Sequence, residues 1–525
     1  MERHKEAVAA IAATIRHFYD RKEPFRIFHG STNSTRPLSL QRNGMIDTSS
    51  LNHVLKVDKK SKIVLVEPNV PMDALVEATL EHGLVPPVVM EFPGITVGGG
   101  FAGTSGESSS FIYGFFDKAA TWIEIVLGNG DVVTASTSEN ADLFRGAAGS
   151  FGTLGVTTLL ELRLIDAKEY VQLTYTPVAS VSKAIQKLEQ AIHDPKLDFV
   201  DGIMFSSTSG TICTGTLTST PSPSPQSKIQ TFHRPHDPWF YLHAAHLTAL
   251  SPTTPVTETT PLQSYLFRYD RGAFWTGRHA FRYFLVPFAP LTRWLLDHFM
   301  HTRVMYHALH ESGHMDRYIL QDCVVPARTA EEFISYVDSE LGIWPLWLCP
   351  LRKLARGERS FHPHAGDQEG EMALNVGVWG PGPSEGRAFE GVNWRLEGKL
   401  RELGGMKWLY AQVFCSEDEF WGMYDREGYE TLREKWGAGS LPSVWEKVRW
   451  KERKERKGLK GLLWKVWPVS GLYGVWKAWG GGDYLIKRER EGWLVWAILL
   501  VLGLLLGMLS LVWVRHNQYT RYYIP

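Results

Sequence analysis

The C-terminal end of the chain carries a run of 22 residues without a charged side chain, from Trp493 to Val514. An α-helix rises about 1.5 Å per residue, so this run would be roughly 33 Å long, enough to cross the hydrocarbon core of a bilayer. Tryptophans lie near both ends of the run, where indole rings favour the membrane interface. Soluble helices seldom stay uncharged over such a length. The sequence therefore predicts a transmembrane helix over 493–514 and a short tail over 515–525.

The N-terminal residues, MERHKEAVAAIAATIRHFYDRK, alternate charges with short apolar stretches, so no cleaved leader is expected. A single span at the far end then predicts a C-terminal anchor with the body of the protein facing the cytosol. Lys487, Arg488 and Arg490 before the span agree with this orientation, although Arg515 and Arg521 beyond it weaken the signal.

Glycines inside the predicted span leave the oligomeric state open. Gly503 and Gly507 form a small-xxx-small pair, which would let a second copy approach and form a homodimer. Ordinary membrane glycines are the alternative.

The segment before the span, residues 451–492, is basic and rich in tryptophan. Its part from Leu459 to Trp479 mixes tryptophan, leucine and lysine, which suits a helix in the lipid headgroup layer. A helix packed on the body of the protein is the competing interpretation.

Charge and cysteine usage exclude several classes of function. The 56 basic residues balance 56 acidic ones, which argues against a nucleic-acid-binding protein. The four cysteines lie far apart without a C-x-x-C pair, so neither a disulfide framework nor a thiolate metal site is expected.

The pattern of apolar residues predicts an α+β fold in two parts for the body of the protein. Alternating apolar segments predict strands in residues 1–166, with a hairpin turn at Gly128 to Asp131 and a helix from Pro71 to Leu84. Residues 167–450 form the second part. We expect helices there over 176–194, 279–326 and 417–437, and strands over 198–207, 211–220, 373–379 and 407–414.

A glycine-rich run, Thr96 to Gly106, is the strongest local signal. Glycines let backbone N–H groups approach an anion closely, which is how pyrophosphates are held. Gly98 to Gly103 fits the letters G-x-G-x-x-G, but a polar loop follows where a dinucleotide-binding fold needs a helix, so we reject that fold. A second polar loop, His29 to Arg36, predicts that both loops face one ligand with two phosphates; a hydrogen-bonded turn is the alternative.

The letters H-E-x-x-H occur once, from His310 to His314. Gly313 would weaken a helix there, and no third ligand follows at the usual spacing. We therefore expect surface histidines and no metal site.

Polar residues inside apolar strings are candidates for proton transfer. A carboxyl or phenol in a closed apolar site can act as a general acid. Structural, hydrogen-bonded groups are the alternative for each. The candidates are Asp322, His362, Tyr410 and Glu419.

These motifs resemble a known family, the FAD-linked oxidases of the vanillyl-alcohol-oxidase fold, with its PCMH-type FAD-binding domain. The loops FHGSTNST and TVGGGFAGTSG and the pattern Gly152-Thr153-Leu154-Gly155-Val156-Thr157 carry the resemblance. Within that family, the stretches ITVGGGFAGTSGESSSFIYG, SENADLFRGAAGSFGTLG, QDCVVP, WPLWLCP and MKWLYAQVFCSEDEFWGMYD are similar to the delta-24 sterol reductase (Diminuto-like) branch.

The resemblance implies a two-subdomain FAD-binding domain over 1–166 and a substrate (cap) domain over 167–450. It also implies an endoplasmic reticulum membrane enzyme, which passes a hydride from NADPH through noncovalently bound FAD to the 24,25 double bond of a sterol side chain. An oxidase of an alcohol or sugar acid that uses oxygen, and a membrane scaffold without activity, are the rival functions. The cofactor-binding residues that it implies are His29, Gly30, Ser31, Thr32, Asn33, Ser34, Thr96, Val97, Gly98, Gly99, Gly103, Thr104, Gly106, Glu107, Ser108, Gly152, Gly155 and Val156.

Overall fold

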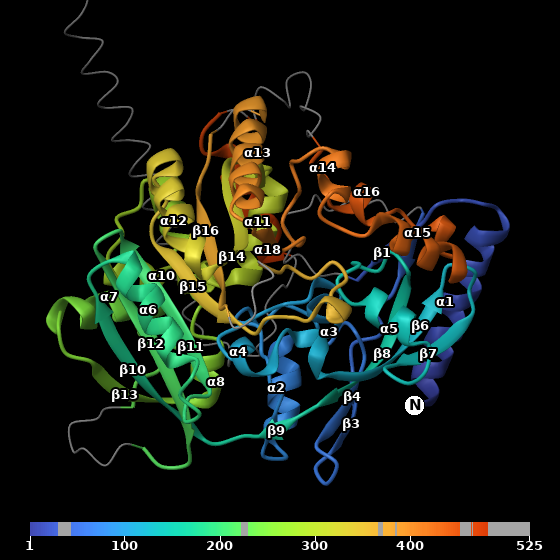
Figure 1. Cartoon of the computed structure of the whole chain (residues 1–525), viewed down its shortest axis with the longest axis horizontal. Helices are drawn as coiled ribbons and strands as arrows, with labels where there is room; N and C mark the ends of the chain where they lie inside the picture. Colours follow the sequence, from blue (N-terminus) through green and yellow to red (C-terminus); the bar gives the residue numbers. More distant parts are fainter. Residues whose placement is uncertain are drawn as a thin grey trace, which may run out of the picture.

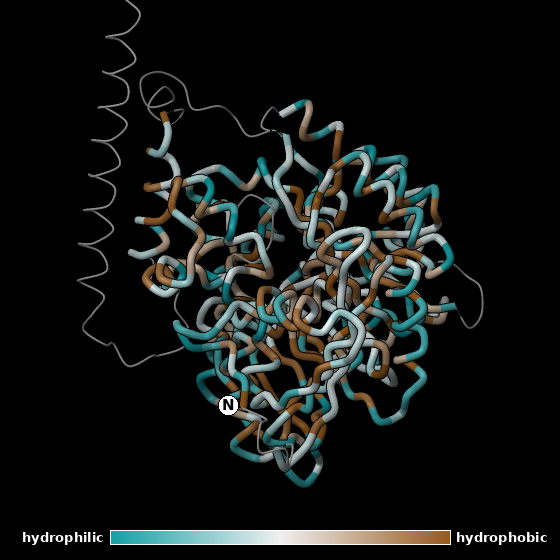
Figure 2. The backbone as a smooth tube through the Cα atoms, turned by 90° about the vertical axis from the view of Figure 1, so that its left-hand side faces the viewer, coloured by the Kyte–Doolittle hydropathy of each residue, from teal (hydrophilic) through white to brown (hydrophobic). Residues whose placement is uncertain are grey.

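Two β-sheets, each covered by its own helices, make up the protein (Figure 1). The computed structural model describes residues 1–29, 44–221, 229–365, 371–383, 386–451, 464 and 466–480. Hydrophobic backbone segments lie mostly inside and hydrophilic ones outside (Figure 2). This separation is what burial of apolar surface dictates.

The first sheet has five strands in the order β3-β4-β8-β6-β7, and all its neighbouring pairs are antiparallel. The predicted hairpin is confirmed, since Val126 pairs with Val132 across the turn at residues 128–131. An antiparallel sheet contains none of the parallel crossovers of a dinucleotide-binding fold. The strands are β3 (Val54–Asp58), β4 (Ile63–Val66), β6 (Ala120–Leu127), β7 (Val132–Ser136) and β8 (Gly155–Arg163).

Helices cover this first sheet. In α1 (Glu2–Asp20), Val8, Ile11 and Ile15 are buried at spacings of three and four, which is the stripe of an amphipathic helix. The predicted helix after Pro71 is α2 (Met72–Leu80), and α5 (Ala141–Ala147) follows β7. Short parallel strands, β1 (Arg26–Phe28) and β2 (Met45–Asp47), and the pair β5 (Leu84–Val85) and β9 (Ile165–Asp166) complete this part.

The second sheet has eight strands in the order β13-β10-β12-β11-β15-β16-β14-β17. Helices α6 (Val181–Ala191), α12 (Ala327–Leu341) and α13 (Gly386–Glu402) bury one of its faces in a separate apolar core. Its other face joins the core of the first sheet through residues such as Trp347 and Trp379. The strands are β10 (Tyr170–Val178), β11 (Phe199–Ser206), β12 (Ser209–Thr218), β13 (Val256–Pro261), β14 (Tyr318–Pro326), β15 (Leu346–Leu351), β16 (Ala373–Pro381) and β17 (Met406–Lys407).

Three predictions of secondary structure were wrong in part. The expected helical region over 279–326 becomes strand β14 from Tyr318 onward, because this stretch pairs with β16 in the sheet. The expected strand over 407–414 is limited to the end of β17, and turns follow it. The expected helix over 417–437 is split into α14 (Glu417–Trp421) and α15 (Arg426–Lys435), because the Asp425 side chain caps the second helix at Gly428 N–H, 2.9 Å away.

A group of aromatic rings packs between further helices and the second sheet. Tyr269 stacks on Phe274 with 3.9 Å between ring centroids, and Phe274 meets Trp379 at 4.0 Å. The helices in this part are α7 (Phe240–Leu250), α8 (Leu262–Leu266), α9 (Gly277–Tyr283), α10 (Pro290–Leu295), α11 (Thr302–Ser312) and α18 (Val469–Gly480).

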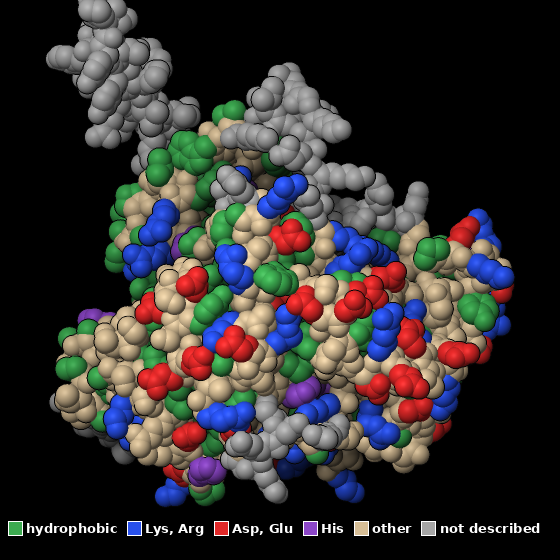
Figure 3. Space-filling model, turned by 45° about the horizontal axis from the view of Figure 1, so that its top comes forward, with side chains coloured by type: hydrophobic (Ala, Val, Ile, Leu, Met, Phe, Trp, Pro, Cys, Tyr) green, Lys and Arg blue, Asp and Glu red, His purple; other side chains and the backbone are tan. Residues whose placement is uncertain are grey.

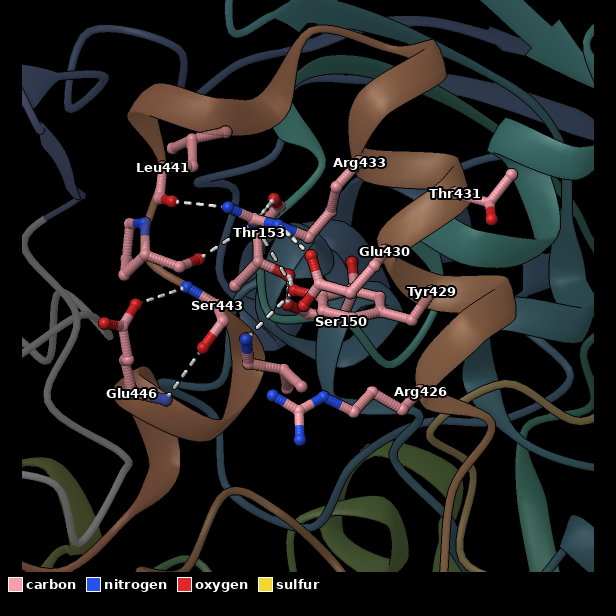
Figure 4. A network of polar contacts seen from close by, with 12 residues as sticks. Ser150, Thr153, Arg426, Tyr429, Glu430, Thr431, Arg433, Leu441, Ser443 and Glu446 are labelled. Carbon is pink, nitrogen blue, oxygen red and sulfur yellow. Dashed lines mark hydrogen bonds and ion pairs between the residues drawn. The ribbon is translucent and has the colours of Figure 1, made fainter. Parts of the chain in front are cut away.

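The segment that follows the second sheet returns to the first one. α15 lies beside α5, and α16 (Val444–Val448) follows it in the chain (Figure 1). The buried Arg433 side chain holds them there, since its guanidinium donates to the carbonyls of Thr153 at 2.9 Å, Leu441 at 2.8 Å and Pro442 at 3.2 Å (Figure 4). The Tyr429 hydroxyl donates to Thr153 Oγ1 at 2.8 Å beside it.

Arg433→Met is expected to lower the free energy of unfolding by about 3 to 5 kcal/mol, because it leaves two buried carbonyls and one partly buried carbonyl without their donor. Denaturant titration followed by tryptophan fluorescence measures this loss. The matched control is Arg426→Met, since Arg426 is exposed and its ion pair with Glu417 is a surface contact of 3.3 Å. The control is expected to change stability by less than about 1 kcal/mol. Equal effects of the two substitutions would contradict the role of Arg433.

Over the described residues, we find no helix that combines the length and the apolarity needed to cross a bilayer. The predicted span, Trp493 to Val514, and its tail lie outside those residues. Part of the predicted headgroup-layer segment is described as α18, which packs against α11.

Candidate active site

A cavity of about 340 Å³ lies where the first sheet's loops meet the second sheet. Its walls come from the glycine-rich run, the start of β8, the strands β14, β15 and β16, and the turn after β17. This size falls in the range of small-molecule and cofactor sites, and most of the lining is apolar.

The glycine-rich run forms one wall. Contrary to the predicted loop, its first part is a short helix, α3 (Val97–Gly103), capped by the Thr96 hydroxyl, which accepts from Gly99 N–H at 3.1 Å. The N–H groups of Gly98 and Gly100 donate to the carbonyls of Pro68 and Thr96. The N–H groups of this first turn therefore donate to acceptors of the protein itself. They are not available to a ligand, so the glycines have to contribute to the site in another way.

The glycines of the run contribute to the site because they have no side chains. A Cβ at Gly98 would lie 2.7 Å from Pro68 Cβ, and one at Gly100 would lie 2.3 Å from Met90 Cε, so these two glycines permit close packing of α3. A Cβ at Gly99 would meet only the Thr96 hydroxyl, at 3.1 Å, and one at Gly103 only the Phe151 ring, at 3.6 Å. Gly99 and Gly103 line the cavity, and side chains there would reduce it.

The predicted cofactor-binding residues fall into three groups. Val97 and Thr104 are buried in the protein, while Glu107 and Ser108 face the second sheet, with Glu107 4.0 Å from the Arg268 guanidinium. Gly30, Ser31, Thr32, Asn33 and Ser34 lie outside the described residues. Those that line the cavity are His29, Thr96, Gly98, Gly99, Gly103, Gly106, Gly152, Gly155 and Val156.

Asp322 and Tyr410, two of the predicted proton-transfer residues, meet on the cavity wall. The Tyr410 hydroxyl donates to Asp322 Oδ2 at 2.7 Å, and the Asn375 amide donates to Asp322 Oδ1 at 3.0 Å. Asp322 lies on β14 and Asn375 on the neighbouring β16, whose antiparallel register brings them together. All three residues line the cavity.

The environment raises the pKa of both members of this pair. Burial raises the pKa of Asp322 from its ordinary 3.8 to about 6, against the opposing effect of the hydrogen bonds from Asn375 and Tyr410. Burial, and then the charge of Asp322, raises the pKa of the Tyr410 phenol well above its usual range. A carboxyl with a pKa near the operating pH is suited to general acid catalysis.

The sequence analysis missed Glu91, Tyr306 and Asn375, which also line the cavity. Burial, and then Glu107, raises the pKa of Glu91 well above its ordinary value. Asn375 could have been found as a polar residue in the apolar string ALNVGVW, the same signal that singled out Asp322. Glu91 precedes the glycine-rich run without such a pattern.

The other two predicted catalytic residues lie outside the cavity lining. His362 is buried, and its Nε2 lies 2.9 Å from Asp117 Oδ2, while its ring stacks on Phe115. Glu419 belongs to the capping box of α14 and forms an ion pair with Arg401 at 2.6 Å. Both side chains are held by structural contacts.

The H-E-x-x-H letters do not form a helical metal motif. α11 ends at Ser312, and Gly313 adopts a left-handed conformation with φ of 76°, so His314 leaves the helix. Among the described residues, no group of three or more His, Cys, Asp or Glu side chains could hold a metal ion.

Two observations test whether this cavity suits a flavin dinucleotide. Gly99 and Gly103 line the cavity, and a Cβ at either position would meet a single side chain, so the missing side chains leave room for a ligand. Within the described residues, the buried Asn375 Oδ1 has no hydrogen-bond partner, although it lines the cavity. A ligand donor beside it would satisfy that oxygen. The residues present fit a large ligand with polar edges.

Comparison with known proteins supports the same cofactor. Residues 5–136 match the model of a family described as an FAD binding domain. The chain is 30% identical to the human Delta(24)-sterol reductase over 407 residues, which is 76% of each chain. It is 33% identical to the Arabidopsis thaliana Delta(24)-sterol reductase over 448 residues, or 79% of this chain and 78% of that one. A cytokinin dehydrogenase of rice is more distant, at 27% identity over 38% of this chain. This chain belongs to the Delta(24)-sterol reductase family of FAD-binding proteins.

Proposed function

We propose that this chain is an FAD-dependent reductase of a sterol side-chain double bond, with NADPH as the electron donor. The observation that carries the proposal is the Asp322–Tyr410 pair, which holds a proton on the wall of a glycine-lined cavity. Reduction of an alkene needs both a hydride and a proton, and such a pair supplies the second.

FAD would be held noncovalently between two walls of the cavity. Gly99 and Gly103 of α3 form one wall, and Gly152 and Gly155 before and at the start of β8 form the other. When bound, FAD supplies hydride transfer. His29 lies on the cavity and exposes its side chain.

The proton reaches the substrate from Asp322 or through Tyr410. Asn375 and Tyr410 donate to the two carboxyl oxygens of Asp322, so the carboxyl is fixed in orientation. Saturation of the alkene places a hydride on one carbon and a proton on the other, and the pair lies on the wall of the cavity that would hold the substrate. Phe92, Tyr306 and Trp347 also line the cavity and would help to exclude water.

A lipid substrate also accounts for a membrane location. The predicted anchor over 493–514 and the apolar lining suit a substrate that dissolves only in lipid. We propose attachment to the endoplasmic reticulum membrane with the body of the protein in the cytosol. A homodimer through Gly503 and Gly507 stays a prediction.

Anaerobic incubation with FAD, NADPH and a sterol with an unsaturated side chain tests the function. We expect bleaching of the flavin absorption band by NADPH, and then a mass gain of two hydrogens on the sterol. A sterol with a saturated side chain is the control and should stay unchanged. Flavin reduced by an alcohol or sugar acid and reoxidised by oxygen, without sterol turnover, would establish the oxidase instead. Protein without a flavin band would overturn both.

A further inference from the structure

A second, apolar cavity of about 110 Å³ lies between α9, α11 and α18. It shares two lining residues, Phe92 and Tyr306, with the larger cavity. We propose that this second cavity is a port, through which the lipid substrate passes from a bilayer surface to the larger cavity. The inference rests on the proposed function for the identity of the lipid, a sterol.

Phe92 and Tyr306 form the partition between the two cavities. Their ring centroids lie 6.1 Å apart, edge to face, and Phe92 also meets Phe274 at 5.7 Å. Two ring side chains in contact can move apart by rotamer changes, whereas a wall of backbone could not. A substrate that passes from the port to the larger cavity would displace these rings.

The second sheet brings the inner end of the port close to the proton-donating pair. Leu320, on the port wall, and Asp322, on the wall of the larger cavity, are two residues apart on β14 and share one face of the strand. This spacing is roughly 7 Å. An apolar molecule in the port would thus present its far end to Asp322.

Among the described residues that line the port, none is charged at neutral pH. His314 is its one imidazole, and its Nε2 lies 3.0 Å from Ser470 Oγ of α18. Burial, and then Arg317, lowers the pKa of His314 to about 4, so the ring is neutral. Such a wall favours an apolar molecule over a charged donor such as NADPH.

Large hydrophobic side chains surround the outer end of the port. α18 packs its small residues against α11, since a Cβ at Gly474 would lie 2.3 Å from Ala308 O, and it exposes Leu472, Trp476 and Trp479. Figure 1 shows the two helices side by side, and Figure 3 shows hydrophobic side chains among basic ones on the upper part of the face. Apolar residues at a surface in such numbers mark an interaction site.

Leu285, which follows α9, is another exposed hydrophobic residue beside the outer end of the port. We call these exposed residues, Leu285, Leu472, Trp476 and Trp479, and the segments that carry them the rim. Tyr283, the neighbour of Leu285, accepts at its carbonyl from the exposed Trp467 indole at 2.7 Å, which ties α9 to the segment before α18. Leu285 is 59% exposed and has a positive φ of 56°, a conformation that favours glycine or asparagine. Folding alone gives no reason for a leucine in this place, whereas insertion into lipid does.

The charges of the rim suit a bilayer rather than a protein partner. The stretch from Gly272 to Leu296 contains three arginines and no acidic residue, and residues 464–480 contain two lysines and no acidic residue. Basic residues beside exposed aromatic and leucine side chains are the pattern of helices that lie in the headgroup layer of anionic membranes.

Ala280→Phe tests the port by filling it, because Ala280 of α9 lines it. We expect the dissociation constant for a fluorescent sterol, and the KM for the unsaturated sterol, to rise at least about tenfold. Flavin loading should not change. The matched control is Ala9→Phe on the exposed side of α1, which should leave both constants unchanged.

The outcomes separate the port from the proposed function. If the wild-type chain binds sterol without reducing it, and Ala280→Phe loses that binding, the port is supported and the proposed function is overturned. Equal sterol binding by Ala280→Phe and the wild-type chain would overturn the port, whatever the turnover. A wild-type chain that binds no sterol would overturn both.

Leu285→Glu tests the bilayer side of the port in the full chain. With sterol delivered in vesicles of phosphatidylcholine and phosphatidylserine, we expect transfer into the protein to slow severalfold, since a carboxylate is repelled there. Leu250→Glu, at an exposed leucine of α7, is the matched control. With cyclodextrin-delivered sterol the two variants should behave alike. Equal rates from vesicles would contradict a lipid-facing rim.

Discussion

Asp322→Asn is expected to slow sterol reduction by about 10² to 10⁴-fold, the usual contribution of a general acid. The amide has nearly the shape of the carboxyl and can keep contacts with Tyr410 and Asn375, but it has no proton to give. Flavin reduction by NADPH should persist, because that step needs no proton from Asp322. Stopped-flow measurement of the two half-reactions separates them.

The matched control is Glu91→Gln, which also converts a carboxyl on the cavity wall into an amide. Burial, and then Glu107, raises the pKa of Glu91 well above its ordinary value, and within the described residues no hydrogen bond joins Glu91 to Tyr410 in the way that Asp322 is joined, so we assign the proton transfer to Asp322. Glu91→Gln should lower the rate of sterol reduction by less than about tenfold. A larger loss in Glu91→Gln than in Asp322→Asn would assign the acid to Glu91 instead.

The pH dependence follows from the same pKa. Since Asp322 has to be protonated to act, sterol reduction should fall as pH rises above about 6, and Asp322→Asn should lack this descending limb. In the folded protein the pKa of Asp322 is raised, so its protonation favours the folded state. The resulting stability is present below about pH 4 and is lost as pH rises to about 6.

Asp322→Asn should therefore be no less stable than the wild-type chain at neutral pH. The increase of the Asp322 pKa from 3.8 to about 6 corresponds to a free-energy cost of at most about 3 kcal/mol for the ionised carboxylate in the folded protein. The amide avoids this cost. Thermal unfolding at acid and neutral pH measures the difference. A variant destabilised at neutral pH would indicate a structural role for the carboxylate.

Local patterns predicted much of this fold. Alternation of apolar residues located β4, β6, β7 and β8, and the turn at residues 128–131 fixed the hairpin. Patterning failed for β14, whose residues are buried on both faces or nearly so, because a continuous apolar run does not distinguish a strand from a buried helix. It also failed at Asp425, where a single side-chain cap divides one helical pattern into two helices.

The site was predictable only where one residue carried a local signal. Asp322 and Tyr410 stood out as polar residues in apolar strings, but their contact at 2.7 Å depends on strands and turns 88 residues apart. Glu419 carried a similar signal and belongs to a helix cap instead. Glu91 carried none, since only the folded chain shows that it lines the cavity and lies near Glu107.

Gly103→Leu is expected to abolish FAD binding, with a loss in affinity of at least about 100-fold. A side chain there starts 3.6 Å from the Phe151 ring and extends into the cavity, so the fold tolerates it while the ligand does not. A bound flavin would have to share the space with four added carbon atoms, and displacement from such a site costs several kcal/mol. The flavin absorption of the purified protein, and titration of the apoprotein with FAD, measure the loss.

Gly398→Leu provides the matched control for this substitution. Gly398 lies within α13, and nothing lies within 4 Å of a Cβ built there, so the same side chain enters a helix without a clash. Leucine favours a helix over glycine by about 0.5 to 1 kcal/mol, and we expect this variant to be as stable as the wild-type chain and to bind FAD normally. Because the two variants differ in whether the new side chain enters the cavity, normal flavin content in Gly103→Leu would place FAD elsewhere. The roles assigned to Asp322 and to the port would then lose their common reference point, since both are defined by their distance from that cavity.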